Sequence, residues 1–95
     1  MKDKVSVQII IEGRVHGVGF RLFTKTNALR FNLTGWVKNT VDGNVEAYAE
    51  GTKDDIENWL ATLFQGPPAS FVTNIHKKWG SVERLMEGFH ILSTY

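Results

Sequence analysis

The chain has 95 residues and a mass of 10.7 kDa, and 42% of its residues are hydrophobic while 22% are charged. This size and balance predict a single folded domain over residues 1–95 and exclude a disordered chain. The net charge of +1 gives no basic excess for a nucleic-acid partner, and the lack of cysteine excludes disulfides, thiolate metal sites and cysteine nucleophiles.

The start of the sequence, Met-Lys-Asp-Lys, is followed by a strand-like run and lacks the apolar core of a signal peptide. The longest fully apolar runs are three residues, so the sequence predicts no membrane span. We therefore expect a cytoplasmic protein without a membrane partner. A monomer is the default expectation for a domain of this size.

Residues 4–12 alternate between apolar and polar side chains, which predicts a half-buried strand. Residues 13–19 are a glycine-dense loop. From Phe20 the apolar spacing becomes that of a helix, predicted over residues 20–31, and Asn32 is expected in a left-handed conformation at its end. The apolar stripe of this helix comprises Phe20, Phe23, Ala28 and Phe31.

Residues 34–40 and 44–50 resemble two strands, and the Asp-Gly pair in Val41-Asp42-Gly43 predicts a hairpin between them. The hairpin is expected to end at Gly51.

A second helix is predicted to begin at Thr52, which forms a capping-box pattern with Asp55, and to stop at Gly66-Pro67-Pro68. Its apolar residues recur at spacings of three and four, which indicates one buried face. They are Ile56, Trp59, Leu60, Leu63 and Phe64.

A third long strand is predicted over residues 70–79, with Val72, Ile75 and Trp79 facing inward and a bulge where its alternation breaks. A short strand is expected within residues 88–92. This order predicts an α+β, ferredoxin-like split βαβ sandwich, with two helices on one face of a mostly antiparallel sheet of four to five strands. The other face of the sheet is expected to be largely solvated.

The glycine-dense loop joins a predicted strand to the beginning of a predicted helix. Gly17 and Gly19 allow backbone conformations that turn N–H groups inward, and the first helical turn adds further N–H groups and a partial positive charge. Arg21 can grip two oxygens of one anion. These features predict a cradle of about phosphate size, with a plain tight turn as the alternative. The Walker and dinucleotide glycine patterns are both absent.

Two stretches resemble the signatures of the acylphosphatase family: Gly-Arg-Val-His-Gly-Val-Gly-Phe-Arg at 13–21 and Gly-Trp-Val-Lys-Asn at 35–39. Asp42-Gly43, Gly66-Pro67-Pro68 and Phe89-x-Ile91 also match, so the resemblance covers essentially the whole chain. The family has the ferredoxin-like fold and hydrolyses the carboxyl–phosphate anhydride of acyl phosphates. The resemblance therefore implies a small-molecule acyl phosphate substrate, no cofactor, no metal and no phosphoenzyme.

The resemblance also implies a role for each matching position. Arg21 matches the family's phosphate-binding arginine, and Asn39 matches the asparagine that positions the attacking water. The loop backbone matches the phosphate cradle. His16 stands where many members have glutamine, and Asn32 where glycine is common, and neither is expected to change the chemistry. The expected substrate-binding residues are Val15, His16, Gly17, Val18, Gly19 and Phe20.

Two other functions stay open at this point. A domain of this fold could bind phosphate or another anion without turnover if Asn39 does not face the cradle. Ferredoxin-like sheets also bind RNA, although here Gly17-Val18-Gly19-Phe20 precedes a helix instead of lying on a central strand, and the net charge is only +1. The three tryptophans are interpreted as packing residues, and the three histidines lack the spacing of metal ligands.

Overall fold

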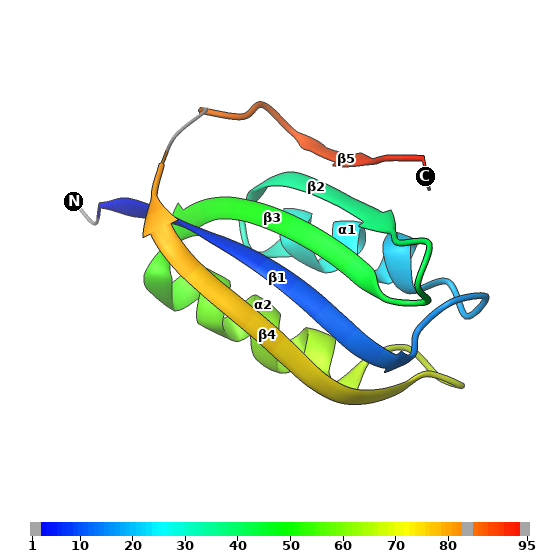
Figure 1. Cartoon of the computed structure of the whole chain (residues 1–95). Coiled ribbons are helices and arrows are strands. Elements are labelled where there is room, and N and C mark those ends of the chain that lie inside the picture. The colour runs from blue at the N-terminus through cyan, green and yellow to red at the C-terminus, as the bar shows by residue number, and fades with distance from the viewer. Residues whose placement is uncertain (1–2, 83–84, 94–95) are drawn as a thin grey trace.

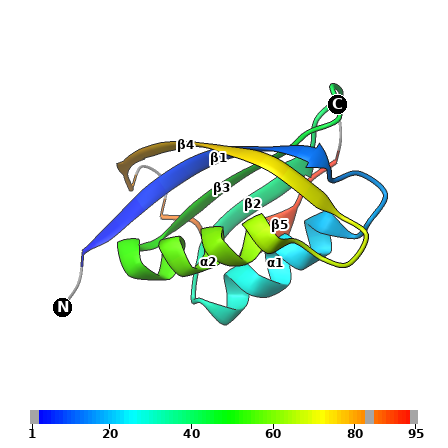
Figure 2. The ribbon, with the colours of Figure 1, turned by 90° about the horizontal axis from the view of Figure 1, so that it is seen from below.

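The computed structural model of the chain describes residues 3–82 and 85–93. Its described part holds two helices that lie on one face of a five-stranded sheet of order β4-β1-β3-β2-β5 (Figures 1 and 2). β5 pairs parallel with β2, and the other neighbours are antiparallel. The predicted α+β arrangement is confirmed. The elements are β1 (Lys4–Arg14), α1 (Phe20–Arg30), β2 (Thr34–Asn39), β3 (Val45–Thr52), α2 (Lys53–Gln65), β4 (Phe71–Ser81) and β5 (Phe89–Ile91).

The core lies between the sheet and the two helices. Alternate residues of β1 are fully buried there, as the predicted period of two requires. Trp59 of α2 is also fully buried, and its indole N–H donates to the Thr24 carbonyl of α1 at 3.1 Å, which joins the two helices. The prediction that Phe64 lies on the buried face of α2 is wrong. This residue is 55% exposed, because it lies at the margin of the α2 stripe and borders a groove between α2 and β4. No helix in the described part of the chain is long and apolar enough to cross a membrane.

The predicted helix ends are confirmed. Asn32, just after α1, has a φ of 60°. β3 runs on to Thr52, slightly further than expected, and the Thr52 hydroxyl accepts from the Asp55 N–H at 3.2 Å at the start of α2. α2 ends at Gln65, and Gly66 follows with a φ of 70°.

We expect the substitution Thr52→Ala to lower the free energy of unfolding by about 1 kcal/mol, because the Asp55 N–H loses its acceptor. Thr52→Ser keeps the hydroxyl and should retain most of this stability. Urea denaturation followed by circular dichroism measures both variants. An equal loss in the two variants would show that the hydroxyl is not the stabilising group.

The predicted bulge lies where β4 pairs with β1. Glu12 pairs with Asn74 and Gly13 pairs with Val72, so Thr73 is the extra residue on β4. Gly13 has a φ of 128°, and a Cβ there would lie 2.0 Å from the Phe71 carbonyl oxygen. Glycine is therefore required at the point where β1 leads into the loop.

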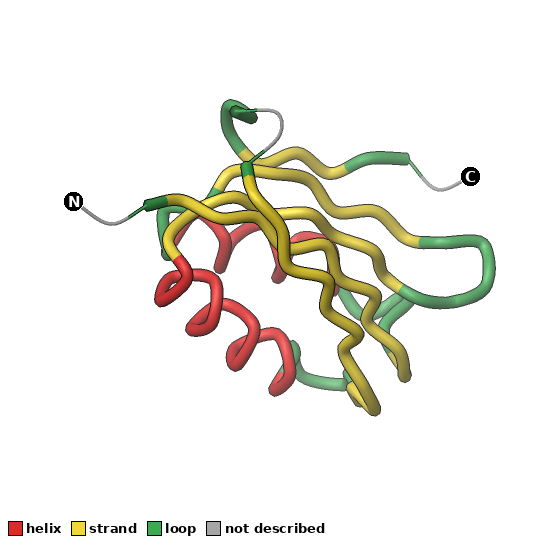
Figure 3. Tube along the Cα trace, turned by 60° about the vertical axis from the view of Figure 1, so that its left-hand side comes forward, coloured by secondary structure: helices red, strands yellow, loops and turns green. Residues whose placement is uncertain are grey.

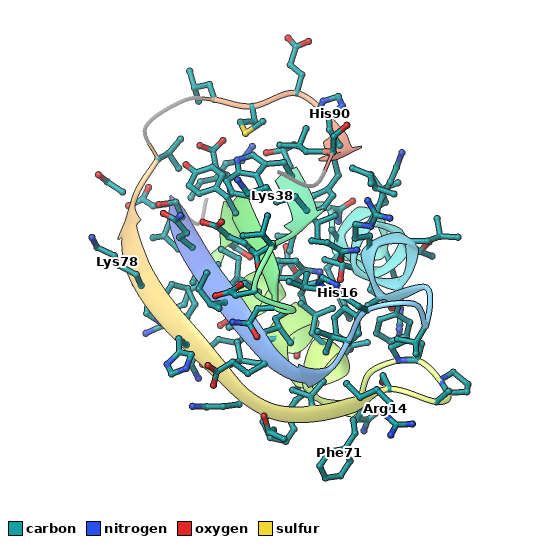
Figure 4. The ribbon with its side chains drawn as sticks, turned by 45° about the vertical axis from the view of Figure 1, so that its right-hand side comes forward. Arg14, His16, Lys38, Phe71, Lys78 and His90 are labelled. Atoms are coloured by element: carbon teal, nitrogen blue, oxygen red, sulfur yellow. The ribbon has the colours of Figure 1, made fainter. Side chains whose placement is uncertain are left out.

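Three residues of β4 were predicted to anchor the strand on the core, and two of them do so. Val72 is buried and Ile75 packs against the core. Trp79 pairs with Val7 and therefore faces the helices as predicted, but it is 39% exposed and does not anchor the core. β4 is an edge strand, and Trp79 lies where only the beginning of α2 borders it, with Lys53 Nζ 5.7 Å from its ring centroid. Phe71 at the start of β4 points out of the molecule (Figure 4).

The face of the sheet opposite the helices is less solvated than predicted. The Trp36 and Tyr48 rings stack there with centroids 6.3 Å apart. The connection from β4 leads back to the far edge of the sheet, where β5 lies beside β2 (Figure 3). On this connection the Met86 N–H donates to Glu50 Oε1 at 2.8 Å, and Glu50 is only 3% exposed. A chain segment with its own polar contacts therefore covers part of this face.

Candidate functional site

Two left-handed glycines shape the loop between β1 and α1. Gly17 has a φ of 70° and Gly19 a φ of 76°. A Cβ on either would meet nothing within 4 Å, so the conformation itself, not crowding, favours glycine there. The space next to both glycines at the Cβ position is therefore open. The loop thus delivers the chain into α1 with room beside the backbone for a small ligand.

The two helices begin in different ways. α2 starts with a capping hydroxyl and carries Asp54 and Asp55 in its first turn. At α1, Gly19 occupies the N-cap, no described side chain caps the helix, and the first turn contains no acid. The first N–H groups of α1 have no acceptor within the helix, and the helix dipole places partial positive charge there. This end of α1 therefore favours an anion.

The sheet brings Asn39 to this end of α1. A cavity of about 260 Å³ opens between the loop, the beginning of α1 and the ends of β2 and β5. Arg21 lines it from the first turn of α1, and Asn39 lines it from the last position of β2. The complete lining is Val15, Gly17, Gly19, Phe20, Arg21, Leu22, Asn39 and Ile91.

The structure therefore brings together Arg21, Asn39 and most of the predicted loop positions, but two predicted side chains lie elsewhere. Val18 packs against the core, and His16 Nε2 lies 2.6 Å from the Asn44 carbonyl oxygen. His16 thus connects the loop to the turn between β2 and β3 and does not line the cavity. Their backbones remain part of the loop.

Two lining residues escaped the sequence prediction. Leu22 follows Arg21 directly, and the available signal was that this apolar residue lies outside the predicted apolar stripe of the helix. Ile91 reaches the cavity only because β5 pairs with β2, which no local pattern indicates. A larger groove of about 490 Å³ between α2 and β4 contains none of the predicted site residues.

The turn that follows Asn39 is tied by several hydrogen bonds. The Thr40 N–H donates to the Asn44 carbonyl at 2.9 Å, and the Asn44 N–H donates to the Thr40 hydroxyl at 3.1 Å. The Thr40 hydroxyl also donates to Asp42 Oδ1. Together with the His16 contact, these bonds hold the end of β2 and the loop in one arrangement, which fixes the backbone that carries Asn39.

The hydrogen bond from Thr40 holds the pKa of Asp42 below its usual value of 3.8, and desolvation acts in the opposite direction. The N–H groups of Asp42 and Asn44 and the charge of His16 lower this pKa further. A lowered pKa means that the folded state favours the ionised carboxylate. This contribution to stability is present above the unfolded pKa and is lost as the pH falls through the folded value, below about pH 4.

We expect a carbon-detected NMR titration to place the pKa of Asp42 below 3.8, and Thr40→Val to raise it toward that value. The same Asp42 midpoint with and without the Thr40 hydroxyl would mean that this hydrogen bond does not govern the titration.

The side chains that line the cavity include a positively charged arginine and a neutral amide, and none of them is acidic. Arg21 is its cation, and the lining contains no carboxylate and no imidazole. No acidic residue occurs in 13–21 or in 35–41. Among residues 3–82 and 85–93, no group of three or more histidines and acids is placed to hold a metal ion. The cavity therefore offers ligands for an anion of phosphate size, with a neutral amide beside it.

Several known relatives of this sequence carry the name acylphosphatase. A sequence model of the acylphosphatase family matches residues 7–91. The chain is 47% identical over 87 residues to an acylphosphatase of Syntrophotalea carbinolica, covering 92% of this chain and 95% of that one. It is 42% identical over 82 residues to that of Thermus thermophilus, covering 86% and 92%.

Solved structures agree with this match. The acylphosphatase of Bacillus subtilis superposes with a TM-score of 0.91 at 38% identity, covering 93% of this chain and 98% of that one. Full-length HypF in its phosphate- and nucleotide-bound form gives a TM-score of 0.89 at 31% identity, covering 99% of this chain but 12% of that one. The resemblance carried by the two sequence signatures is thereby confirmed.

Proposed function

Because this chain belongs to the acylphosphatase family and hydrolyses acyl phosphates, we propose that the reaction takes place in the cavity between the loop, Arg21 and Asn39. The observation that carries the proposal is that Arg21 and Asn39, from different elements, line one cavity together with the glycine loop. The mechanism is a direct attack of water on the phosphorus atom, which gives a carboxylate and inorganic phosphate.

The loop and Arg21 hold the phosphoryl group. Phosphoryl transfer passes through a loose transition state with negative charge on the equatorial oxygens. The N–H groups of the loop and of the first turn of α1 are fixed dipoles, so they stabilise that charge without reorganising. The planar guanidinium of Arg21 binds two oxygens at once. Val15, His16, Gly17, Val18, Gly19 and Phe20 contribute through their backbone.

Asn39 positions the attacking water. Its amide oxygen accepts a hydrogen bond from the water and its amide nitrogen donates one, which orients the water toward phosphorus. The amide is neutral, whereas a carboxylate in its place would repel the dianionic substrate. The hydrogen-bonded turn after Asn39 keeps the water site in register with the cradle.

The acyl group supplies the remaining chemistry. A carboxylate leaves readily, so the bond from phosphorus to the acyl oxygen breaks with little acid catalysis. The water oxygen forms the new bond to phosphorus, and its proton passes to the leaving carboxylate. The proposal needs no metal, no cofactor and no phosphoenzyme. A pH–rate break at the pKa of a protein side chain would contradict this proton path.

We further propose that the protein acts as a cytoplasmic monomer without a nucleic-acid partner. The net charge of +1 supports the last point, because phosphate-backbone binding needs a surplus of lysine and arginine. The small size and the lack of cysteine are compatible with the others.

Release of inorganic phosphate from benzoyl phosphate, measured with and without EDTA, tests the proposed mechanism. We expect the same rate under both conditions, because the cavity lining has donors for an anion and no carboxylate or imidazole for a metal. A rate that falls with EDTA and returns with added divalent cation would refute the metal-free reaction. Tight phosphate binding without any turnover would instead indicate an anion-binding module.

A further inference from the structure

Two large apolar side chains flank the proposed reaction site and remain open to solvent. Leu22 is 62% exposed and Ile91 is 40% exposed, and both line the cavity that contains Arg21 and Asn39. Single exposed apolar residues are common on protein surfaces, but here two from different elements border one polar cavity. We propose that Leu22 and Ile91 form an acyl-binding subsite that favours acyl phosphates with a bulky apolar acyl group.

Leu22 occupies the helix side of the cavity. It follows Arg21 in the first turn of α1 and does not belong to the buried face of this helix, which comprises Phe20, Thr24, Asn27 and Ala28. Packing in the core therefore gives no reason for leucine at this position. Leu29 on the same helix is 51% exposed as well, but it does not line the cavity.

Ile91 occupies the sheet side of the cavity. It pairs with Val37 in the parallel ladder between β5 and β2, and the Leu92 N–H donates to the Val37 carbonyl at 2.8 Å. Val37 faces the helices and is fully buried, and Asn39, two residues further along β2, faces the same way. Paired residues of parallel strands share a face, so Ile91 lies on the helix side of the sheet, as Asn39 does, and both line the cavity.

The chemistry of the substrate connects these two residues to the acyl group. The inference rests on the proposed function, because it assumes that the loop and Arg21 hold the phosphoryl group. The acyl carbon then lies beyond the bridging oxygen, on the outward side of the cradle. The exposed lining side chains there are apolar, so they stabilise a phenyl or branched alkyl group by removing it from water and offer little to a methyl group.

The test compares kcat/KM for benzoyl phosphate and acetyl phosphate in the natural protein, in Leu22→Ser and in Ile91→Ser. Leu29→Ser is the matched control, because it removes another exposed leucine from the same helix. We expect each cavity variant to lower kcat/KM for benzoyl phosphate by about five- to tenfold, as for other single apolar contacts in pockets. The kcat/KM for acetyl phosphate should fall much less, so the ratio of the two kcat/KM values decreases, because acetyl phosphate carries no bulky acyl group. Inorganic phosphate lacks an acyl group altogether, so its inhibition should be as strong as in the natural protein.

The outcomes separate this inference from the proposed function. An equal fall for both substrates, weaker inhibition by phosphate, or unchanged benzoyl phosphate kinetics in Leu22→Ser would overturn the acyl subsite. If Ile91→Ser does not fold, Leu22→Ser alone decides the question. No turnover of either substrate by the natural protein would contradict the proposed function instead.

Discussion

Arg21→Ala is expected to lower kcat/KM for benzoyl phosphate by about a thousandfold or more, the range seen when a charge that stabilises a phosphoryl transition state is removed. Arg21 is the only cation that lines the described cavity, so nothing else there takes over its charge. Arg21→Lys keeps the charge but loses the planar pair of donors, so we expect it to recover only part of the activity.

The matched control for Arg21 is Arg30→Ala, at the other end of the same helix. Arg30 lies over the Phe31 ring at 4.9 Å and does not line the cavity, so its removal should leave turnover intact. Phosphate release and inhibition by inorganic phosphate are measured for all variants. Arg21→Ala should also weaken this inhibition. Turnover of Arg21→Ala within tenfold of the natural protein would remove Arg21 from the mechanism.

Asn39→Ala is expected to lower kcat by about a hundred- to a thousandfold with little change in KM. In the proposed mechanism, Asn39 acts on the attacking water, whereas the loop and Arg21 bind the phosphoryl group before and during the reaction. Asn39→Asp is nearly isosteric with asparagine, but it places a negative charge next to a dianion. We therefore expect Asn39→Asp to lose kcat and also to raise KM.

Asn58→Ala provides the control for these variants, since Asn58 is an exposed residue of α2 away from the cavity. Full kinetic curves are needed, because the split between kcat and KM is the decisive readout. A raised KM with an unchanged kcat in Asn39→Ala would assign the residue to substrate binding and not to water positioning.

The elements that could be predicted from sequence are those that are determined by residues close together in the chain. The alternation in residues 4–12 gave β1, and the Thr52–Asp55 capping pattern placed the start of α2. The left-handed Gly17 and Gly19 were foreseen for the same reason, because a tight strand-to-helix turn demands such conformations within a few residues. Arg21 is local to this turn as well, so its place at the cavity followed directly.

The predictions that failed concern residues whose burial depends on elements far away in the sequence. Phe64 and Trp79 have the right spacing and facing, but both border the open groove between α2 and the edge strand β4. A periodic pattern tells which side of an element is apolar, and it does not tell how far the neighbouring element extends over that side. The same limit applies to Glu50, which the connection after β4 covers.

By itself, the sequence determined the order of the elements and the glycine loop before α1, because periodicity, capping and glycine conformation act over a few neighbouring residues. The roles proposed for Arg21 and Asn39 came instead from the resemblance of their two stretches to the signatures of the family. Only the tertiary structure decided that Asn39 and Ile91 meet Arg21 and Leu22 at one cavity. That meeting depends on the pairing of β2 with β3 and of β5 with β2, whose hydrogen bonds join segments far apart in the chain.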